Sequence, residues 1–133
     1  MFVDTKELIA VELFYKKNEK GRNLIVLRNL DLLGEDAKKT FTKVTMKMRP
    51  MNWKIYNDLQ RESMVDKGTG DGEHIDWVKY KEIKLLKLLA EWDAKDKDSN
   101  KIQINQETIN SLHPLMAEFA LSEYDKKSIL SDE

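Results

Sequence analysis

The sequence predicts an α+β fold, in which a small antiparallel sheet precedes a helical part. Before residue 50, apolar residues alternate with polar ones in short runs, which is the period of β-strands. After residue 51 they recur every three or four residues, which is the period of α-helices. We expect one domain over residues 1–133, with a β-rich part over 1–50, three helices over 51–127 and a loose tail over 128–133.

The first two strands are predicted to form a β-hairpin. Residues 8–17 alternate, residues 24–30 are apolar and β-branched, and the polar segment 18–23 between them contains Gly21. Two such runs around a glycine-containing loop are typical of a hairpin. The first strand should place four side chains on one side: Ile9, Val11, Leu13 and Tyr15.

A third strand is predicted over residues 40–50, where Thr, Val and Phe favour extended structure. Pro50 should end it, because proline cannot donate a hydrogen bond to a strand ladder. Residues 31–39 form the connection before this strand, with room for one short helical turn.

The first helix should begin after Asn52, a good N-cap residue, and run through residues 53–67. Segment 68–74 holds three glycines within five residues, which breaks any helix. We expect a flexible linker there rather than a phosphate-binding loop, because no strand precedes it and it lacks the lysine of such loops.

The strongest helical pattern covers residues 75–93, with Asp76 as a possible cap. Its core face should carry Val78, Leu85, Leu86, Leu89 and Trp92, widened by Trp77 and Leu88. Tyr80 and Ile83 fall on the other side. The helix is therefore either an ordinary central helix of the domain or one that contacts a second surface, which could be the hairpin, another copy of the protein or a bound client.

The last helix is predicted over residues 104–127, with Asn105 as its cap. Its apolar positions follow the helical period through Ile109, Leu112, Met116 and Phe119. Pro114 lies inside this pattern and should kink or split the helix after Leu112 and His113.

Residues 96–107 resemble a calcium-binding loop, with Asp96, Asp98, Asn100 and Glu107 at positions 1, 3, 5 and 12. Position 6 holds Lys101 instead of the glycine that the sharp turn needs, and the chain has no second such loop. We therefore expect a structural turn without calcium, with Glu107 in the first turn of the last helix, where an acidic residue favours the helix dipole.

Composition excludes several classes of function. Charged residues make up 35% of the chain, yet the net charge is −1 and no basic patch typical of nucleic-acid binding stands out. The first 50 residues hold 11 basic and 7 acidic residues, and the remainder holds 12 and 17, which suggests contact with a protein partner. There is no cysteine, no apolar run long enough to span a membrane and no recognisable leader sequence.

An enzymatic site is not expected either. The two histidines, His74 and His113, lack the spacing of a zinc-binding helix, and no nucleophile or nucleotide-binding motif is present. We expect no cofactor.

Several short motifs follow one another over residues 44–124: an Arg-Pro start to the first helix, a long helix closing in Trp-Asp, a polar turn with an extended piece, and a final helix with Leu and Pro near its start. The residues concerned are Arg49, Pro50, Trp53, Trp92, Asp93, Ile102, Ile104, Glu107, Leu112 and Pro114. The order of these motifs resembles the tail assembly chaperones of tailed bacteriophages. His113 intervenes between the Leu and the Pro, and Lys101 stands where the relatives often have glycine, so the turn is expected to differ.

The resemblance implies a non-enzymatic protein of the host cytoplasm that binds the tape-measure or tail-tube protein during tail assembly. The open alternatives are a structural component of the phage tail or baseplate that stays in the virion, and a small metal-responsive domain. Self-association is a further expected contact. The candidate partner-binding residues are Trp53, Tyr80 and Ile83.

Overall fold

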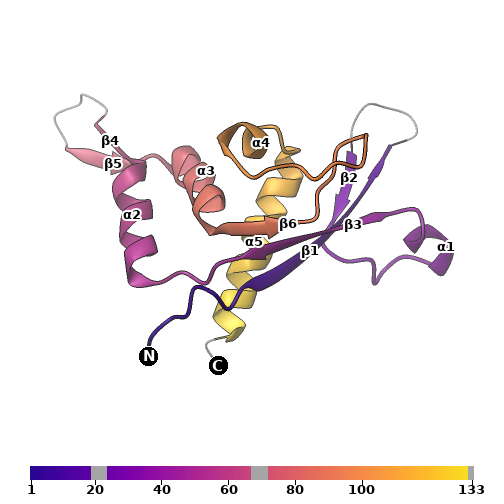
Figure 1. The fold of residues 1–133 in the computed structure, drawn as a ribbon, viewed down its shortest axis with the longest axis horizontal. Helices are drawn as coiled ribbons and strands as arrows, with labels where there is room; N and C mark the ends of the chain where they lie inside the picture. The colour runs from indigo at the N-terminus through magenta and orange to yellow at the C-terminus, as the bar shows by residue number, and fades with distance from the viewer. Residues whose placement is uncertain (19–23, 67–71, 132–133) are drawn as a thin grey trace.

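The computed structural model describes residues 1–18, 24–66 and 72–131. Strands β1 (Ile9–Lys17), β2 (Leu24–Leu27), β3 (Thr42–Met48) and β6 (Leu89–Trp92) form an antiparallel sheet in the order β2-β1-β3-β6. Helix α5 (Pro114–Ser131) crosses one face of it (Figure 1). The predicted α+β class is confirmed, and so is the pairing of the first two strands as a hairpin. Most of the predicted hairpin turn, residues 19–23, lies outside the described residues.

The sheet has one buried and one solvated face, as strand alternation requires. Val11 and Leu13 of β1 are fully buried beside Val44 and Met46 of β3. Residues in between, such as Lys47, face the opposite side and are exposed. The predicted inward side of the first strand is thus confirmed, with Ile9 and Tyr15 packing at the edge of the same core.

Helix α1 (Glu35–Lys38) is the single helical turn expected in the connection between β2 and β3. Helix α2 (Trp53–Ser63) follows β3, and the Asn52 side chain accepts a hydrogen bond from the Ile55 N–H at 2.9 Å, which confirms the predicted cap.

Helix α2 ends earlier than predicted. Strands β4 (Met64–Asp66) and β5 (Glu73–Ile75) follow it and form a separate two-stranded sheet. The Ser63 hydroxyl donates to the Leu59 carbonyl at 2.6 Å, and the Ser63 carbonyl accepts from the Asp76 N–H at 2.9 Å. These bonds compete with continuation of the helix. Of the predicted glycine-rich linker, residues 68–71 lie outside the described residues.

Helix α3 (Trp77–Leu88) is also shorter than the predicted helix over 75–93, because the last residues of that pattern form strand β6. The Asp76 cap is confirmed, since its carboxylate accepts from two backbone N–H groups of the first turn. The helix stops where Arg49 binds it. The Arg49 N–H donates to the Leu88 carbonyl at 2.7 Å, and its guanidinium donates to the carbonyls of Lys87 and Leu89 at 3.1 and 3.2 Å.

Pro114 splits the last predicted helix, as expected. Helix α4 (Gln106–Asn110) precedes the break and α5 follows it, with Pro114 as the first residue of α5. Asn105 caps α4 in a reciprocal arrangement with Thr108. Residues 128–131 were expected in a loose tail, but they continue α5, and residues 132–133 lie outside the described part.

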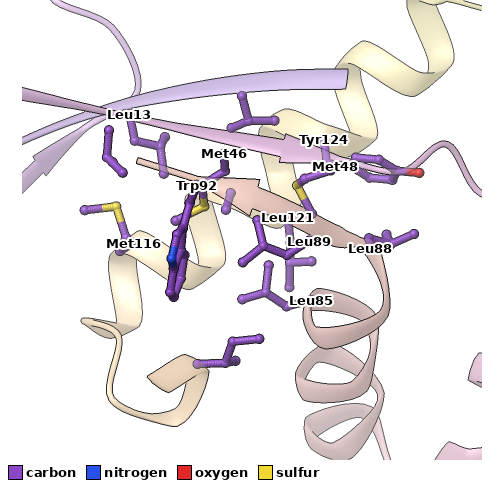
Figure 2. Close-up of a cluster of buried hydrophobic side chains, with 14 of the residues drawn as sticks. Leu13, Met46, Met48, Leu85, Leu88, Leu89, Trp92, Met116, Leu121 and Tyr124 are labelled. Carbon is purple, nitrogen blue, oxygen red and sulfur yellow. The ribbon is translucent and has the colours of Figure 1, made fainter. Parts of the chain in front are cut away.

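The core lies between the sheet and the helices α3, α4 and α5. Figure 2 shows the side chains of β3, β6 and α3 gathered there together with those of α5. Its buried members are Val11, Leu13, Val26, Val44, Met46, Met48, Leu85, Leu88, Leu89, Trp92, Ile109, Met116, Ala120, Leu121 and Tyr124. Helix α2 packs mainly on α3 and lies with β4 and β5 at one end of the molecule (Figure 1).

Candidate protein-binding surface

Two aromatic pairs stand on the helices at the α2 end of the molecule. In α2, the rings of Trp53 and Tyr56 stack with their centroids 5.7 Å apart, and Trp53 is 75% exposed. In α3, the rings of Trp77 and Tyr80 meet edge to face at 5.2 Å. Aromatic side chains left this exposed are characteristic of binding surfaces.

The α3 pair is continuous with a further exposed apolar side chain. Trp77 is 62% exposed and Val78 is 68% exposed, whereas Tyr80 is half-buried. We refer to Trp77, Val78 and Tyr80 as the α3 aromatic surface. Because it occupies the first turn of α3, it lies before the point at which the helix reaches the core at Leu85.

A groove runs between α3 and α5 beside this surface. One part of it, of about 490 Å³, is lined by Trp77 and Tyr80, and a second part, of about 390 Å³, is lined by Val78 and Leu85. Both parts include Leu121. The α3–α5 groove therefore joins exposed aromatic side chains to an apolar floor.

Two ion pairs connect α3 with α5 at this groove. Lys81 Nζ lies 2.8 Å from Glu118 Oε1, and Lys84 Nζ lies 2.9 Å from Asp125 Oδ1. Lys84 also lies 5.8 Å from the centre of the Tyr80 ring, within range of a cation–π contact. Three of these four side chains are half exposed, so each pair contributes little stability and a ligand can rearrange it.

The three partner-binding residues predicted from the sequence do not form one cluster. Trp53 belongs to the α2 aromatic pair, and Tyr80 belongs to the α3 pair. Ile83 is half-buried and is not among the described residues that line the α3–α5 groove. Among the described residues of the hairpin, none lines the part of the groove that contains Tyr80.

Trp77 and Val78 were missed as surface residues because the sequence places them on the core face of a longer helix. In the structure the core face of α3 consists mainly of Leu85 and Leu88, and the helix ends there.

Trp92 is a core residue, as the Leu and Trp pattern predicted, but it lies in a strand. It is 4% exposed, and its indole Nε1–H donates to the Ile102 carbonyl at 2.6 Å. Ile109 is buried in the same core, and Leu112 packs against it.

In the segment that resembles a calcium loop, residues 96–107, the Asp96 carboxylate binds backbone N–H groups of the same turn. Asp96 Oδ1 accepts from the N–H groups of Asp98 and Asn100 at 2.9 and 3.0 Å. Ser99, not Lys101, adopts the left-handed conformation, with φ of 63°, and Glu107 lies in the first turn of α4. The structural turn predicted for this segment is therefore what the chain forms.

Within residues 1–18, 24–66 and 72–131, no group of three His, Asp or Glu side chains is placed to hold a metal ion. His113 has a local role, because its Nδ1 accepts from the Leu115 N–H at 3.2 Å at the start of α5, and His74 is exposed in β5. Among the helices of the described residues, none combines the length and the apolar character that crossing a membrane requires.

Comparison of the chain with known protein families, with curated proteins and with solved structures finds no match.

Proposed function

We propose that the protein is a non-enzymatic tail assembly chaperone of a tailed bacteriophage, which binds the tape-measure or tail-tube protein in the host cytoplasm. The observation that supports protein binding most directly is the α3 aromatic surface. Trp77 and Val78 together leave a large apolar area in water, and burying such side chains against a partner is favourable. The phage assignment itself rests on the sequence resemblance.

The α3–α5 groove supports a helical client segment. Its floor includes Leu85 and Leu121, and its walls carry both signs of charge at Lys81 and Glu118. An apolar groove with charged walls suits the apolar face of an amphipathic helix. Opening the exposed ion pairs along it costs little, so the groove can adapt to its client.

The second candidate function is a structural component of the tail or baseplate. Strand β2 lies at the end of the sheet, and all four of its residues, Leu24–Leu27, are apolar. An apolar edge strand can pair with the sheet of a neighbouring subunit in an assembly. This function would place the protein in the virion.

One experiment separates the two functions. The tagged protein is purified from infected cells during assembly, the bound proteins are identified by mass spectrometry, and the protein is quantified in finished particles. A chaperone should carry the tape-measure or tail-tube protein and be absent from particles. Fixed stoichiometry in particles would favour the structural component. Absence of tail proteins among the bound proteins, together with absence of the protein from particles, would contradict both proposals.

Matched variants test the surface. Trp77→Ser with Val78→Ser should abolish capture of the client while the melting temperature stays nearly constant, because both side chains are exposed. Trp53→Ser with Tyr56→Ser is the control at the other aromatic pair. If only the Trp53 and Tyr56 variant loses capture of the client, the binding site lies on α2 and not on α3.

A further inference from the structure

Helix α3 passes into strand β6 without a connecting residue, because α3 ends at Leu88 and β6 begins at Leu89 (Figure 2). The helical period continues past this point, since Leu85, Leu89 and Trp92 follow one another at i, i+4 and i+7. Leucine, alanine and glutamate, which form most of β6, are good helix formers, and alanine and glutamate are depleted from strands. The local preference of residues 89–92 is therefore helical, and their extended conformation needs another cause.

Arg49 occupies the three carbonyls that the next turn of the helix would use. In a continued helix, the carbonyls of residues 87, 88 and 89 would accept from the N–H groups of residues 91, 92 and 93. In the structure, the carbonyls of residues 87 and 89 accept from the Arg49 guanidinium at 3.1 and 3.2 Å, and that of residue 88 accepts from the Arg49 N–H at 2.7 Å. One residue at the end of β3 thus replaces three consecutive hydrogen bonds of a helix.

Strand β6 needs an irregularity to bury its two large side chains. Leu89 and Trp92 are 2% and 4% exposed, although residues three apart in a regular strand point to opposite faces. Both are buried because Trp92 pairs with Met46 and Leu89 pairs with Met48, which leaves Ala90 unpaired in the described ladder of β3 and β6. A continued helix would place both side chains on one face without this irregularity, so their burial does not by itself favour the strand.

Three further hydrogen bonds hold the extended form. The Trp92 indole N–H donates to the Ile102 carbonyl at 2.6 Å. The Asp93 N–H donates to the Thr45 carbonyl at 3.2 Å, and the Thr45 N–H donates to Asp93 Oδ1 at 2.8 Å. With the contacts of Arg49, these bonds oppose the helical preference of the segment.

The chain after β6 has room to follow a change of conformation. Four residues span about 13 Å in a strand and about 6 Å in a helix. Residues 93–101 form the turn that follows, and all of them except the half-buried Ala94 are exposed. The Asp96 carboxylate bonds only within this turn. An exposed turn of this kind can shift with the end of the preceding segment.

We infer that residues 89–92 are a helix–strand switch controlled by Arg49. With the guanidinium on the carbonyls at the end of α3, the segment is strand β6. When the guanidinium leaves them, these carbonyls accept from the N–H groups that follow, and the segment winds onto α3 as its next turn. The helical form uncovers the edge of β3 that β6 covers. The switch is a property of the fold, so it does not rest on the proposed phage function.

NMR of the full chain labelled with ¹³C and ¹⁵N tests the inference. In the natural protein, the ¹³Cα signals of residues 89–92 should lie upfield of their random-coil positions, as in a strand. In Arg49→Ala they should lie downfield, as in a helix, and amide–amide contacts between successive residues should appear from Leu88 to Asp93. The Trp92 indole N–H should exchange faster with solvent, because its bond to the Ile102 carbonyl is lost.

Two variants separate a switch from a general loss of stability. Arg49→Ala with Glu91→Thr should return the segment to the strand, because threonine has a lower helix propensity and a higher strand propensity than glutamate. Glu91 is exposed, so this substitution does not disturb the core. Arg61→Ala removes a surface arginine of α2 and should leave the signals of residues 89–92 unchanged.

Strand signals at residues 89–92 in a folded Arg49→Ala protein would overturn the inference, since Arg49 would then stabilise the junction without selecting its conformation. If Arg49→Ala does not fold, saturation-transfer NMR of the natural protein decides. A minor state with helical ¹³Cα positions over residues 89–92 supports the switch, and the lack of such a state overturns it.

Discussion

The Tyr124 hydroxyl in α5 donates a hydrogen bond to the backbone carbonyl of Arg49 at 3.0 Å, across 75 residues of sequence. Arg49 in turn binds the last carbonyls of α3. A single arginine thus connects the end of β3, the end of α3 and the final helix. These contacts lie at the point where α3 ends and β6 begins, and two predictions test what they contribute to stability.

Stability should fall in strong alkali because of Tyr124. Burial, helped by the negative charge of Asp125, raises the pKa of Tyr124 to about 12 from 10.0. The neutral form is favoured in the folded state, so its contribution is complete below about pH 10 and is lost as the pH rises toward 12. The loss should be on the order of 2 kcal/mol. Chemical denaturation across this range measures it.

The control is Tyr124→Phe, which keeps the ring and removes the hydroxyl. The variant should start less stable, by about 1 kcal/mol, since the hydrogen bond to Arg49 is lost. It should then show a shallower decline above pH 10, because the hydroxyl with the raised pKa is absent. An unchanged slope would mean that Tyr124 does not titrate as its burial implies.

Arg49→Ala should destabilise the fold by about 1–3 kcal/mol, because the carbonyls of Lys87 and Leu89 lose a charged donor in a partly buried place. Urea denaturation measures the change. The comparison is Arg61→Ala, whose 3.4 Å contact with Asp58 is at the surface and should contribute less than the Arg49 contacts. Equal effects of the two substitutions would argue against the capping role.

Trp92→Ala should cost about 3–5 kcal/mol, since it leaves a cavity between β6 and α4 in addition to an unpaired Ile102 carbonyl. Trp92→Phe should cost less, because it retains most of the apolar volume. Thermal and urea unfolding of both variants provide the test. A folded Trp92→Ala protein with unchanged stability and impaired partner binding would place Trp92 at an interface.

The double substitution Tyr80→Ser with Ile83→Ser should lower stability moderately. Both side chains are half-buried, so each should contribute less than the about 1.5–3 kcal/mol of a fully buried apolar side chain. Client capture should fall, because Tyr80 lines the α3–α5 groove. Unchanged stability together with unchanged capture, measured by calorimetry and pull-down, would show that both residues are merely solvated.

Calcium should not change the melting temperature at millimolar concentration, since Asp96 already holds its own turn. Asp96→Ala should lower stability by about 1 kcal/mol with or without calcium, through loss of those hydrogen bonds. A calcium-dependent rise of several degrees in the natural protein, absent from Asp96→Ala, would instead establish a calcium site.

Local chemistry in the sequence determined most of the elements. Alternation placed Val11 and Leu13 inward, the caps at Asn52, Asp76 and Asn105 began helices, and Pro114 divided the last one. These features act within one turn or one strand, so neighbouring residues are enough to specify them. The turn over residues 96–101 belongs to the same group, because Asp96 bonds to its own near neighbours.

The tertiary structure alone decided where α3 ends and what its first turn faces. Residues 89–92 continue a strong helical pattern, but β3 offers a strand edge and Arg49 binds the carbonyls at which the helix stops. Those contacts join segments about 40 residues apart, which no local pattern encodes. The helix loses its last turn to β6, and Trp77 and Val78 in its first turn are exposed because the core contacts of α3 lie at Leu85 and Leu88. The exposed surface on α3 therefore follows from tertiary packing, whereas the helix that carries it follows from the sequence.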